Sequence, residues 1–254
     1  MSSSPVLSTK GLNVGYGHRT VLQGIDTVVL PGTFTTLIGA NGSGKSTLLR
    51  TLSGTQAPLE GYIALNGKDM AMMRRRELAR SLSMVFTDRS GGGALTVRET
   101  VEIGRHPYTG LLGRLSANDR EIVDSSIAAV GMGHMTDRLL GTLSDGERQK
   151  VMIARALAQD TPLIILDEPT AFLDVAGRIE ITAMLRSLAD NGKAIILSTH
   201  DVSTAISAAD NLWIVDKSTG TLHAADKKTA IASGMTELAF PSLKFDKQTL
   251  SYTL

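Results

Sequence analysis

Cysteine is absent from this chain of 254 residues. Its absence excludes a disulfide framework, a thiolate metal site and a cysteine nucleophile, and it is compatible with a reducing compartment. The sequence also contains no uninterrupted apolar run that approaches the length of a membrane span. Residues 1–8 have neither a basic segment nor a long apolar segment, so they do not resemble a signal peptide. We therefore expect a cytoplasmic protein whose membrane role, if it has one, depends on a partner.

The chain has no large excess of charge of one sign: 26 Lys and Arg residues stand against 25 Asp and Glu residues, for a net charge of +1. This balance supplies no broad basic field, so we expect no nucleic-acid partner. Hydrophobic residues make up 42% of the chain and charged residues 20%, as is ordinary for a folded globular protein. The length suits one large core or two small ones.

The first motif is Gly39-Ala-Asn-Gly-Ser-Gly-Lys-Ser46, which fits the phosphate-binding loop pattern G-x-x-x-x-G-K-[ST] at every fixed position. An apolar run at 35–38 precedes it and a predicted helix at 47–52 follows, which is the expected strand-loop-helix context. A Gly-rich turn alone would not explain Lys45 and Ser46, whose ammonium and hydroxyl suit phosphates and Mg²⁺. We expect a nucleotide to contact the loop residues Gly39, Asn41, Gly42, Ser43, Gly44, Lys45, Ser46 and Thr47.

Two continuously apolar runs, 163–166 and 194–197, predict central parallel strands covered on both faces. Asp167 and Glu168 follow the first run and His200 follows the second, so these side chains should meet where open α/β sheets bind ligands. Asp167 is a candidate to hold Mg²⁺ through water. A turn at Pro169 can bring Glu168 over the γ-phosphate as a general base. His200 is a candidate γ-phosphate contact, although a lone histidine at a strand end is more often structural.

The wider pattern predicts an α/β fold: a P-loop NTPase core with a mainly parallel sheet, an N-terminal antiparallel β layer and an inserted helical subdomain. We expect a single domain over 1–254. Residues 1–89 and 159–225 should form the nucleotide-binding core, 90–158 the helical subdomain and 226–254 a C-terminal extension.

Residues Ser144 to Glu147 predict a capping box at the start of a helix, with Ser and Glu three positions apart. Taken alone, this pattern indicates a helix start and nothing more. The same geometry leaves backbone N–H groups at the positive end of a helix dipole, which is what a phosphate site needs.

Together with Tyr16 and Leu173-Asp174, these motifs resemble, in order and spacing, the ATP-binding subunits of ABC transporters. The resemblance implies that Tyr16 stacks on adenine; the alternative is an ordinary strand-edge tyrosine. It also implies that Ser144, Gly146 and Glu147 belong to a signature motif that reaches the γ-phosphate held by a second copy of the chain. Leu173-Asp174 resemble the loop that joins the two sites of such a dimer.

The segment 95–107 resembles the ATPases that power import of iron-siderophore complexes, haem and cobalamin, although an ordinary loop and exposed helix is its alternative. The resemblance implies an ATP-hydrolysing homodimer on the cytoplasmic face of the inner membrane. It also implies integral membrane permease subunits as partners and, indirectly, a solute-binding protein. A non-transport ABC ATPase acting on a soluble protein assembly is the alternative.

Two departures from the family pattern stand out. Thr87 replaces the Gln that usually contacts Mg²⁺, and our hypothesis is that Thr87 or Asp88 makes this contact through water or a shifted loop. The signature also carries Asp145 and Glu147, whose charges should oppose a polyanion. We expect the capping bond to occupy Glu147 and Arg148 to offset Asp145.

Overall fold

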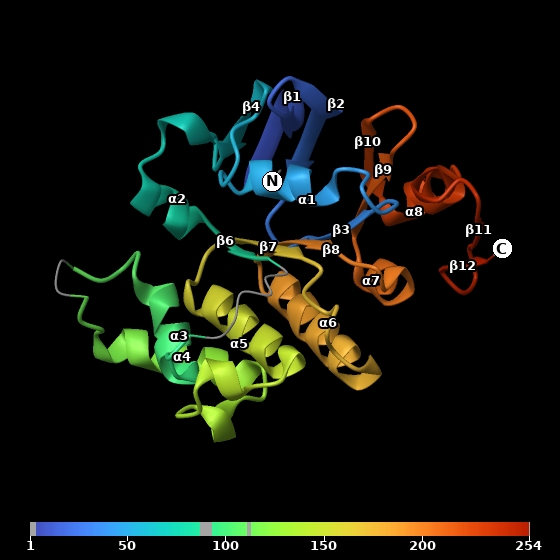
Figure 1. The fold of residues 1–254 in the computed structure, drawn as a ribbon. Coiled ribbons are helices and arrows are strands. Elements are labelled where there is room, and N and C mark those ends of the chain that lie inside the picture. The colour runs from blue at the N-terminus through green and yellow to red at the C-terminus, as the bar shows by residue number, and fades with distance from the viewer. Residues whose placement is uncertain (1–3, 87–92, 111–112, 254) are drawn as a thin grey trace.

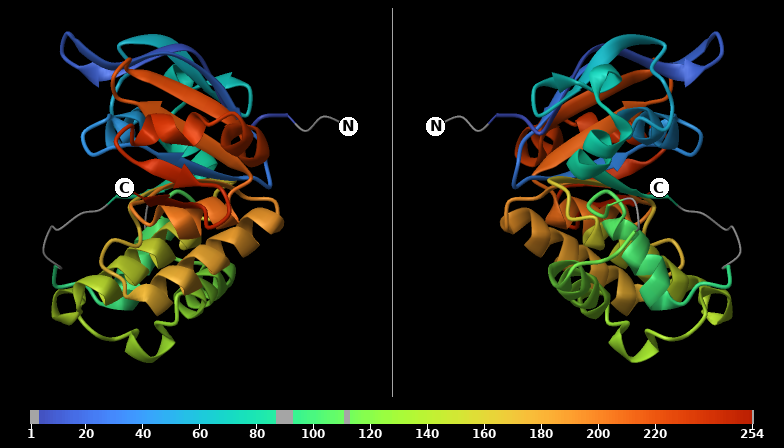
Figure 2. Two further views of the ribbon diagram at one scale, coloured as in Figure 1. Left: turned by 90° about the vertical axis from the view of Figure 1, so that its right-hand side faces the viewer. Right: turned by 90° about the vertical axis from the view of Figure 1, so that its left-hand side faces the viewer.

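The computed structural model describes residues 4–86, 93–110 and 113–253. Thr87 and Asp88, the predicted replacements for the usual Gln, lie outside the described residues. A small antiparallel sheet, a central six-stranded sheet and a group of helices form successive layers (Figure 1). Figure 2 shows the same order from both sides, with the antiparallel sheet at the top and the helices at the bottom.

The central sheet has the strand order β10-β9-β3-β8-β7-β6. Its first five strands along the chain pair in parallel, and β10 pairs antiparallel to β9, so the predicted mainly parallel sheet is confirmed. Every residue of β3, β7 and β8 is buried, as expected for apolar strands covered on both faces. The strands are β3 (Phe34–Ile38), β6 (Leu82–Val85), β7 (Leu163–Asp167), β8 (Ala194–Ser198), β9 (Asn211–Asp216) and β10 (Thr221–Asp226).

The predicted antiparallel β layer is also confirmed. Its strand order is β2-β1-β4-β5, from β1 (Leu7–Tyr16), β2 (Arg19–Val29), β4 (Glu60–Leu65) and β5 (Lys68–Asp69). Helix α1 (Lys45–Leu52) lies between this layer and the central sheet (Figure 1). One hydrophobic core fills this space because both sheets and α1 contribute apolar side chains, including Leu12, Leu48, Leu52, Ile165 and Trp213.

Helices cover the other face of the central sheet and share a second core, which includes Phe34, Val101, Ile127, Ile153 and Leu197. Helices α3, α4 and α5 pack on one another within the stretch predicted to be a helical subdomain. The helices are α2 (Arg75–Ser81), α3 (Val97–Glu102), α4 (Ala117–Ala129), α5 (Asp145–Ala158), α6 (Val175–Asp190), α7 (Val202–Ala208) and α8 (Lys227–Ala232), with short 3-10 turns at 70–72, 103–105, 133–135, 140–142 and 235–239. None of the helices in the described part of the chain has both the length and the apolar character needed to cross a bilayer.

The final part of the chain, after α8, forms a small hairpin. After α8, the strands β11 (Lys244–Asp246) and β12 (Ser251–Thr253) form an antiparallel hairpin. Tyr252 packs edge-to-face with Phe240 and Phe245, at centroid distances of 4.8 and 5.0 Å. Its hydroxyl donates to the carbonyl of Thr236 at 2.6 Å. The hairpin is therefore held by a small aromatic core.

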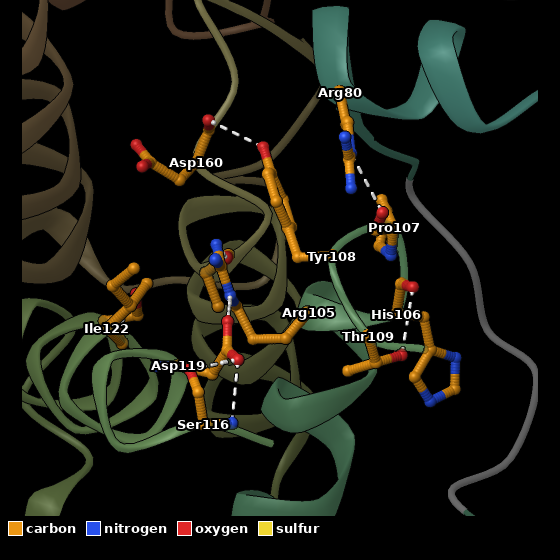
Figure 3. A network of polar contacts seen from close by, with 12 residues as sticks. Arg80, Arg105, His106, Pro107, Tyr108, Thr109, Ser116, Asp119, Ile122 and Asp160 are labelled. Carbon is orange, nitrogen blue, oxygen red and sulfur yellow. Dashed lines mark hydrogen bonds and ion pairs between the residues drawn. The ribbon is translucent and has the colours of Figure 1, made fainter. Parts of the chain in front are cut away.

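Two arginines of α2 hold the chain that follows α3. Arg76 Nε donates to the carbonyl of Pro107 at 2.7 Å. Arg80 Nε donates to the same oxygen at 2.9 Å (Figure 3). The Arg80 guanidinium also lies over the Tyr108 ring, 4.9 Å from its centroid. These contacts attach the helical segment to α2, which leads into β6 of the central sheet.

Arg105 is a buried charge in the same network, with a relative exposure of 4%. Its Nε donates to Asp119 Oδ1 at 2.8 Å, and its Nη1 donates to the carbonyl of Ala158 at 2.7 Å. The guanidinium also lies 4.0 Å from the centroid of the Tyr108 ring, on the side toward Asp119 (Figure 3). One side chain thus connects the 3-10 turn that follows α3, the start of α4 and the end of α5.

Candidate functional site

A hollow of about 370 Å³ opens at the predicted phosphate loop. The loop itself, Tyr16 from the end of β1 and Glu168 from the end of β7 all border it, so the fold brings these predicted residues together. Arg19 and Val21, from the start of β2, also border it and were not predicted. The lining residues are Tyr16, Arg19, Val21, Asn41, Gly42, Gly44, Lys45, Ser46, Thr47 and Glu168. Gly39 and Ser43 belong to the loop but are not among them.

Gly44 explains why the loop requires glycine immediately before α1. Its φ is +106°, a conformation that L side chains rarely adopt, and an added Cβ would lie 2.6 Å from Val21 Cγ1. Helix α1 begins at Lys45, two residues before its predicted start, and has no side-chain cap. The backbone N–H groups of its first turn therefore suit an anion at the positive end of the helix dipole.

Lys45 is folded back over the loop. Its Nζ donates to the carbonyls of Gly39 at 2.7 Å and Ala40 at 3.2 Å. Burial lowers the pKa of the Lys45 ammonium from its ordinary value, and the carboxylates of Glu168 and Asp167 act in the opposite direction. This cation therefore lies in the field of both predicted acidic residues.

Two further groups, one within the phosphate loop and one at its rim, indicate a polar ligand. Ser43 Oγ is buried and has no hydrogen-bond partner among the described residues, which is costly unless a ligand supplies one. The hydroxyl of Tyr16 accepts a hydrogen bond from Thr47 Oγ1 at 3.1 Å, and half of the Tyr16 surface remains exposed beside the loop. An unsatisfied hydroxyl in the loop and an aromatic ring at its rim fit a phosphate chain joined to a base.

The acidic residues lie where parallel strands end, as predicted. Asp167 is the last residue of β7 and accepts a hydrogen bond from Ser198 Oγ at 2.6 Å. Glu168 follows with φ +52°, so the chain turns and does not continue as a strand. His200 Nε2 lies 2.7 Å from Glu168 Oε1. The fold therefore joins Glu168 and His200 directly, beside the cation of Lys45.

The residues present fit a magnesium ion that arrives with a nucleotide. Ser46 borders the hollow, and Asp167 is a hard oxygen donor close enough to affect the pKa of Lys45. No cluster of three or more imidazole, thiol or carboxylate side chains exists within residues 4–86, 93–110 and 113–253 that could hold a metal by itself. Phosphate oxygens and water would therefore complete the coordination, as Mg²⁺ commonly requires.

The predicted capping box at the start of α5 is confirmed. Ser144 Oγ accepts from the Glu147 N–H at 3.3 Å, and Glu147 Oε2 accepts from the Ser144 N–H at 2.8 Å. These bonds from Ser144 hold the pKa of the Glu147 carboxyl below its ordinary value. Arg148 Nη1 lies 3.0 Å from Asp145 Oδ1. Both acidic groups are therefore engaged within the chain, in the way expected from the sequence.

These residues border a second hollow, of about 570 Å³, together with Leu173 and Asp174. None of the residues that line it lines the hollow at the phosphate loop. The structure therefore does not bring Ser144, Gly146 and Glu147 to Lys45 of the same chain. The two groups of residues line separate hollows, which are candidate half-sites.

The class of protein follows from this combination, and comparison with known proteins agrees with it. The family model described as ABC transporter matches residues 22–171, so the chain belongs to the ABC transporter family and is an ATPase subunit of it. Among relatives, the ABC transporter ATP-binding protein MJ0873 of Methanocaldococcus jannaschii is 43% identical over 211 residues, covering 83% of this chain and 73% of the relative.

Two further similarities concern importers and structure. The iron(3+)-hydroxamate import ATP-binding protein FhuC of Bacillus subtilis is 39% identical over 200 residues, covering 78% of this chain and 74% of FhuC. Among solved structures, cbiO1 of Clostridium perfringens, part of the ABC transporter complex cbiONQ, has a TM-score of 0.77 at 28% identity. This match covers 94% of the chain and 97% of cbiO1.

Proposed function

We propose that this chain is the ATP-hydrolysing subunit of an importer for iron-siderophore, haem or cobalamin-type solutes and that it works as a homodimer. The separation of its two half-sites is the observation that carries the proposal. The phosphate-loop hollow is lined by the cations Arg19 and Lys45 but lacks Ser144, while the Ser144 hollow has a helix N-terminus but lacks Lys45. Each hollow supplies what the other lacks, which favours two copies related by a two-fold axis.

In this dimer, each ATP lies between the phosphate loop of one copy and the signature residues of the other. Tyr16 supplies an aromatic surface for adenine, and the loop with Lys45 holds the phosphates. Ser144 and Gly146 of the second copy then close over the γ-phosphate. Closure therefore requires ATP at the interface, and hydrolysis removes the group that holds the two copies together.

Hydrolysis itself depends on placement and charge. Glu168 orients and deprotonates the attacking water, an effect worth about 10²–10⁴ in rate. His200, 2.7 Å from Glu168, holds that carboxylate and contacts the γ-phosphate. Lys45 offsets charge that develops on the transferred phosphoryl group. When bound, Mg²⁺ neutralises phosphate charge as well, and Ser46 and Asp167 are the residues that would hold it.

We place the dimer on the cytoplasmic face of the inner membrane, bound to integral membrane permease subunits. The segment around 95–107 is the proposed docking region, and its attachment to α2 through Pro107 supports that role because a force applied there reaches the central sheet. A solute-binding protein would act indirectly, through the permease. Thr87 or Asp88 remains the proposed link to Mg²⁺.

The replacement Glu168→Gln tests the assignment. We expect this variant to bind ATP and dimerise, which light scattering with and without ATP measures, and to lose ATP turnover. Glu121→Gln, an exposed glutamate on α4, is the matched control and should hydrolyse normally. Normal ATP turnover by Glu168→Gln would contradict the assignment of Glu168 as the general base. Co-purification with a polytopic permease supports transport, whereas co-purification with a soluble scaffold supports the alternative of a non-transport ATPase.

A further inference from the structure

Ser198 is a buried hydroxyl between the two acidic residues of the site. It is the last residue of β8, is completely buried, and pairs in parallel register with Asp167 at the end of β7. Its Oγ lies 2.6 Å from Asp167 Oδ1 and 3.1 Å from the backbone nitrogen of Glu168. One small side chain therefore contacts both neighbours.

The direction of these hydrogen bonds is fixed by chemistry. The Glu168 N–H can only donate, so Ser198 Oγ accepts from it and has its own proton left for the Asp167 carboxylate. A hydroxyl-to-carboxylate bond of this length has the geometry of a strong, charge-assisted bond. Asp167 Oδ1 therefore has a defined direction relative to the sheet.

The same serine holds the turn on which Glu168 depends. Glu168 has φ +52°, which is unfavourable for a residue with a side chain and persists only where surrounding contacts enforce it. Its N–H donates both to Ser198 Oγ and to the Ser198 carbonyl, which lies at 3.0 Å. The turn that directs Glu168 toward the phosphate loop is thus fastened to β8 at a single residue.

We infer that Ser198 is a positioning residue for ATP hydrolysis, one that orients Asp167 toward Mg²⁺ and fixes the turn of Glu168. The inference rests on the proposed function, because it assigns these roles to Asp167 and Glu168. Ser198 acts through them and does not contact ATP. Groups that orient metal ligands typically affect metal affinity or activity by about 10- to 100-fold.

The test compares Ser198→Ala with Ser83→Ala in the full chain. Ser83 is a buried serine on β6 of the same sheet, and its Oγ accepts a hydrogen bond from Thr161 Oγ1 at 3.0 Å. It lies near the N-terminal ends of the parallel strands, away from the carboxyl ends where Ser198 and Asp167 lie. For the first readout, Mg²⁺ is titrated into the chain in the presence of a non-hydrolysable ATP analogue while the melting temperature is measured. The Mg²⁺ midpoint is the concentration that gives half of the maximal rise in melting temperature. The second is kcat for ATP.

In Ser198→Ala, we expect the Mg²⁺ midpoint to rise about 10-fold and kcat to fall about 10-fold. Affinity for the nucleotide in EDTA should stay at the natural value, because the phosphate loop is unchanged. Ser83→Ala should keep the natural Mg²⁺ midpoint and kcat even if its melting temperature falls. If the alanine variant does not fold, Ser198→Cys keeps a similar volume with a much weaker donor and should show the same shifts.

Natural values of both the Mg²⁺ midpoint and kcat in Ser198→Ala would overturn the inference, as would equal shifts in Ser83→Ala. These outcomes leave the proposed function standing as long as the natural chain hydrolyses ATP and Glu168→Gln does not. Absence of hydrolysis by the natural chain would overturn the proposed function and this inference with it.

Discussion

Replacing Arg105 with methionine removes a buried positive charge from the network that joins the helical segment to the rest of the chain. Arg105 and Asp119 are 4% and 10% exposed in their side chains, so water cannot take over the lost contact. Breaking a buried ion pair by removing one partner typically costs 3–5 kcal/mol. Asp119 keeps hydrogen bonds from the Ser116 N–H at 2.9 Å and hydroxyl at 2.6 Å. We therefore expect a loss of about 3 kcal/mol, at the lower end of that range.

Urea unfolding of the full chain measures this change in the free energy of unfolding. Arg98→Met is the matched control, because Arg98 also pairs with an aspartate of α4, Asp124, at 2.8 Å. Those side chains are 38% and 57% exposed, so the control should cost less than about 1 kcal/mol. If both variants lost the same small amount, burial would not be what makes Arg105 important, and the reasoning would fail.

The remaining predictions concern the phosphate loop and the C-terminal hairpin. Gly44→Ala should weaken ATP binding about 10-fold or more in a fluorescence titration, since the added Cβ meets Val21 and the backbone conformation is strained for a residue with a side chain. Gly67→Ala is the control: this glycine also has a positive φ but has open space around it, so the variant should bind ATP normally in the same titration. Burial raises the pKa of the Tyr252 hydroxyl above its ordinary 10.0, so the folded chain keeps it neutral while the unfolded chain ionises. The contribution of Tyr252 to the free energy of unfolding should therefore be fully present below about pH 10 and should fall as the pH rises above it. In Tyr252→Phe, the melting temperature should decline less steeply over that range. Identical pH profiles of the two chains in thermal unfolding would contradict this.

The parts of the site with fixed local spacing were predictable from the sequence. The phosphate loop and the capping box are short motifs in which each residue type has a local reason. The two apolar runs predicted β7 and β8 to within one residue at their carboxyl ends. Asp167 and Ser198 extend the strands because they still pair with each other in register.

The parts that depend on contacts between distant segments were not predictable. Arg19 and Val21 reach the hollow only because β2 returns beside β1, and no local pattern marks them. Ser198 reads as an ordinary residue between an apolar run and His200 until the register of β7 and β8 is known. The C-terminal extension carried no recognisable signal, since its aromatic core forms between residues at 240 and 252.

The order of motifs along the chain gives the proposed dimer a physical link between its two sites. Helix α5 begins at the signature and runs for 14 residues, about 21 Å, before a short loop leads into β7, which ends at Asp167. Gln159, in that loop, donates to the carbonyls of Ala79 and Leu82 at 2.6 and 2.8 Å, so the end of α5 is fixed to α2 and β6. When Ser144 contacts the ATP of the other copy, it therefore positions the N-terminal end of α5. The C-terminal end of α5 is connected through the short loop to β7, the strand that ends at Asp167. In the proposed dimer, each copy would then sense its partner's nucleotide through the same helix that leads to its own Asp167 and Glu168, the proposed magnesium ligand and general base.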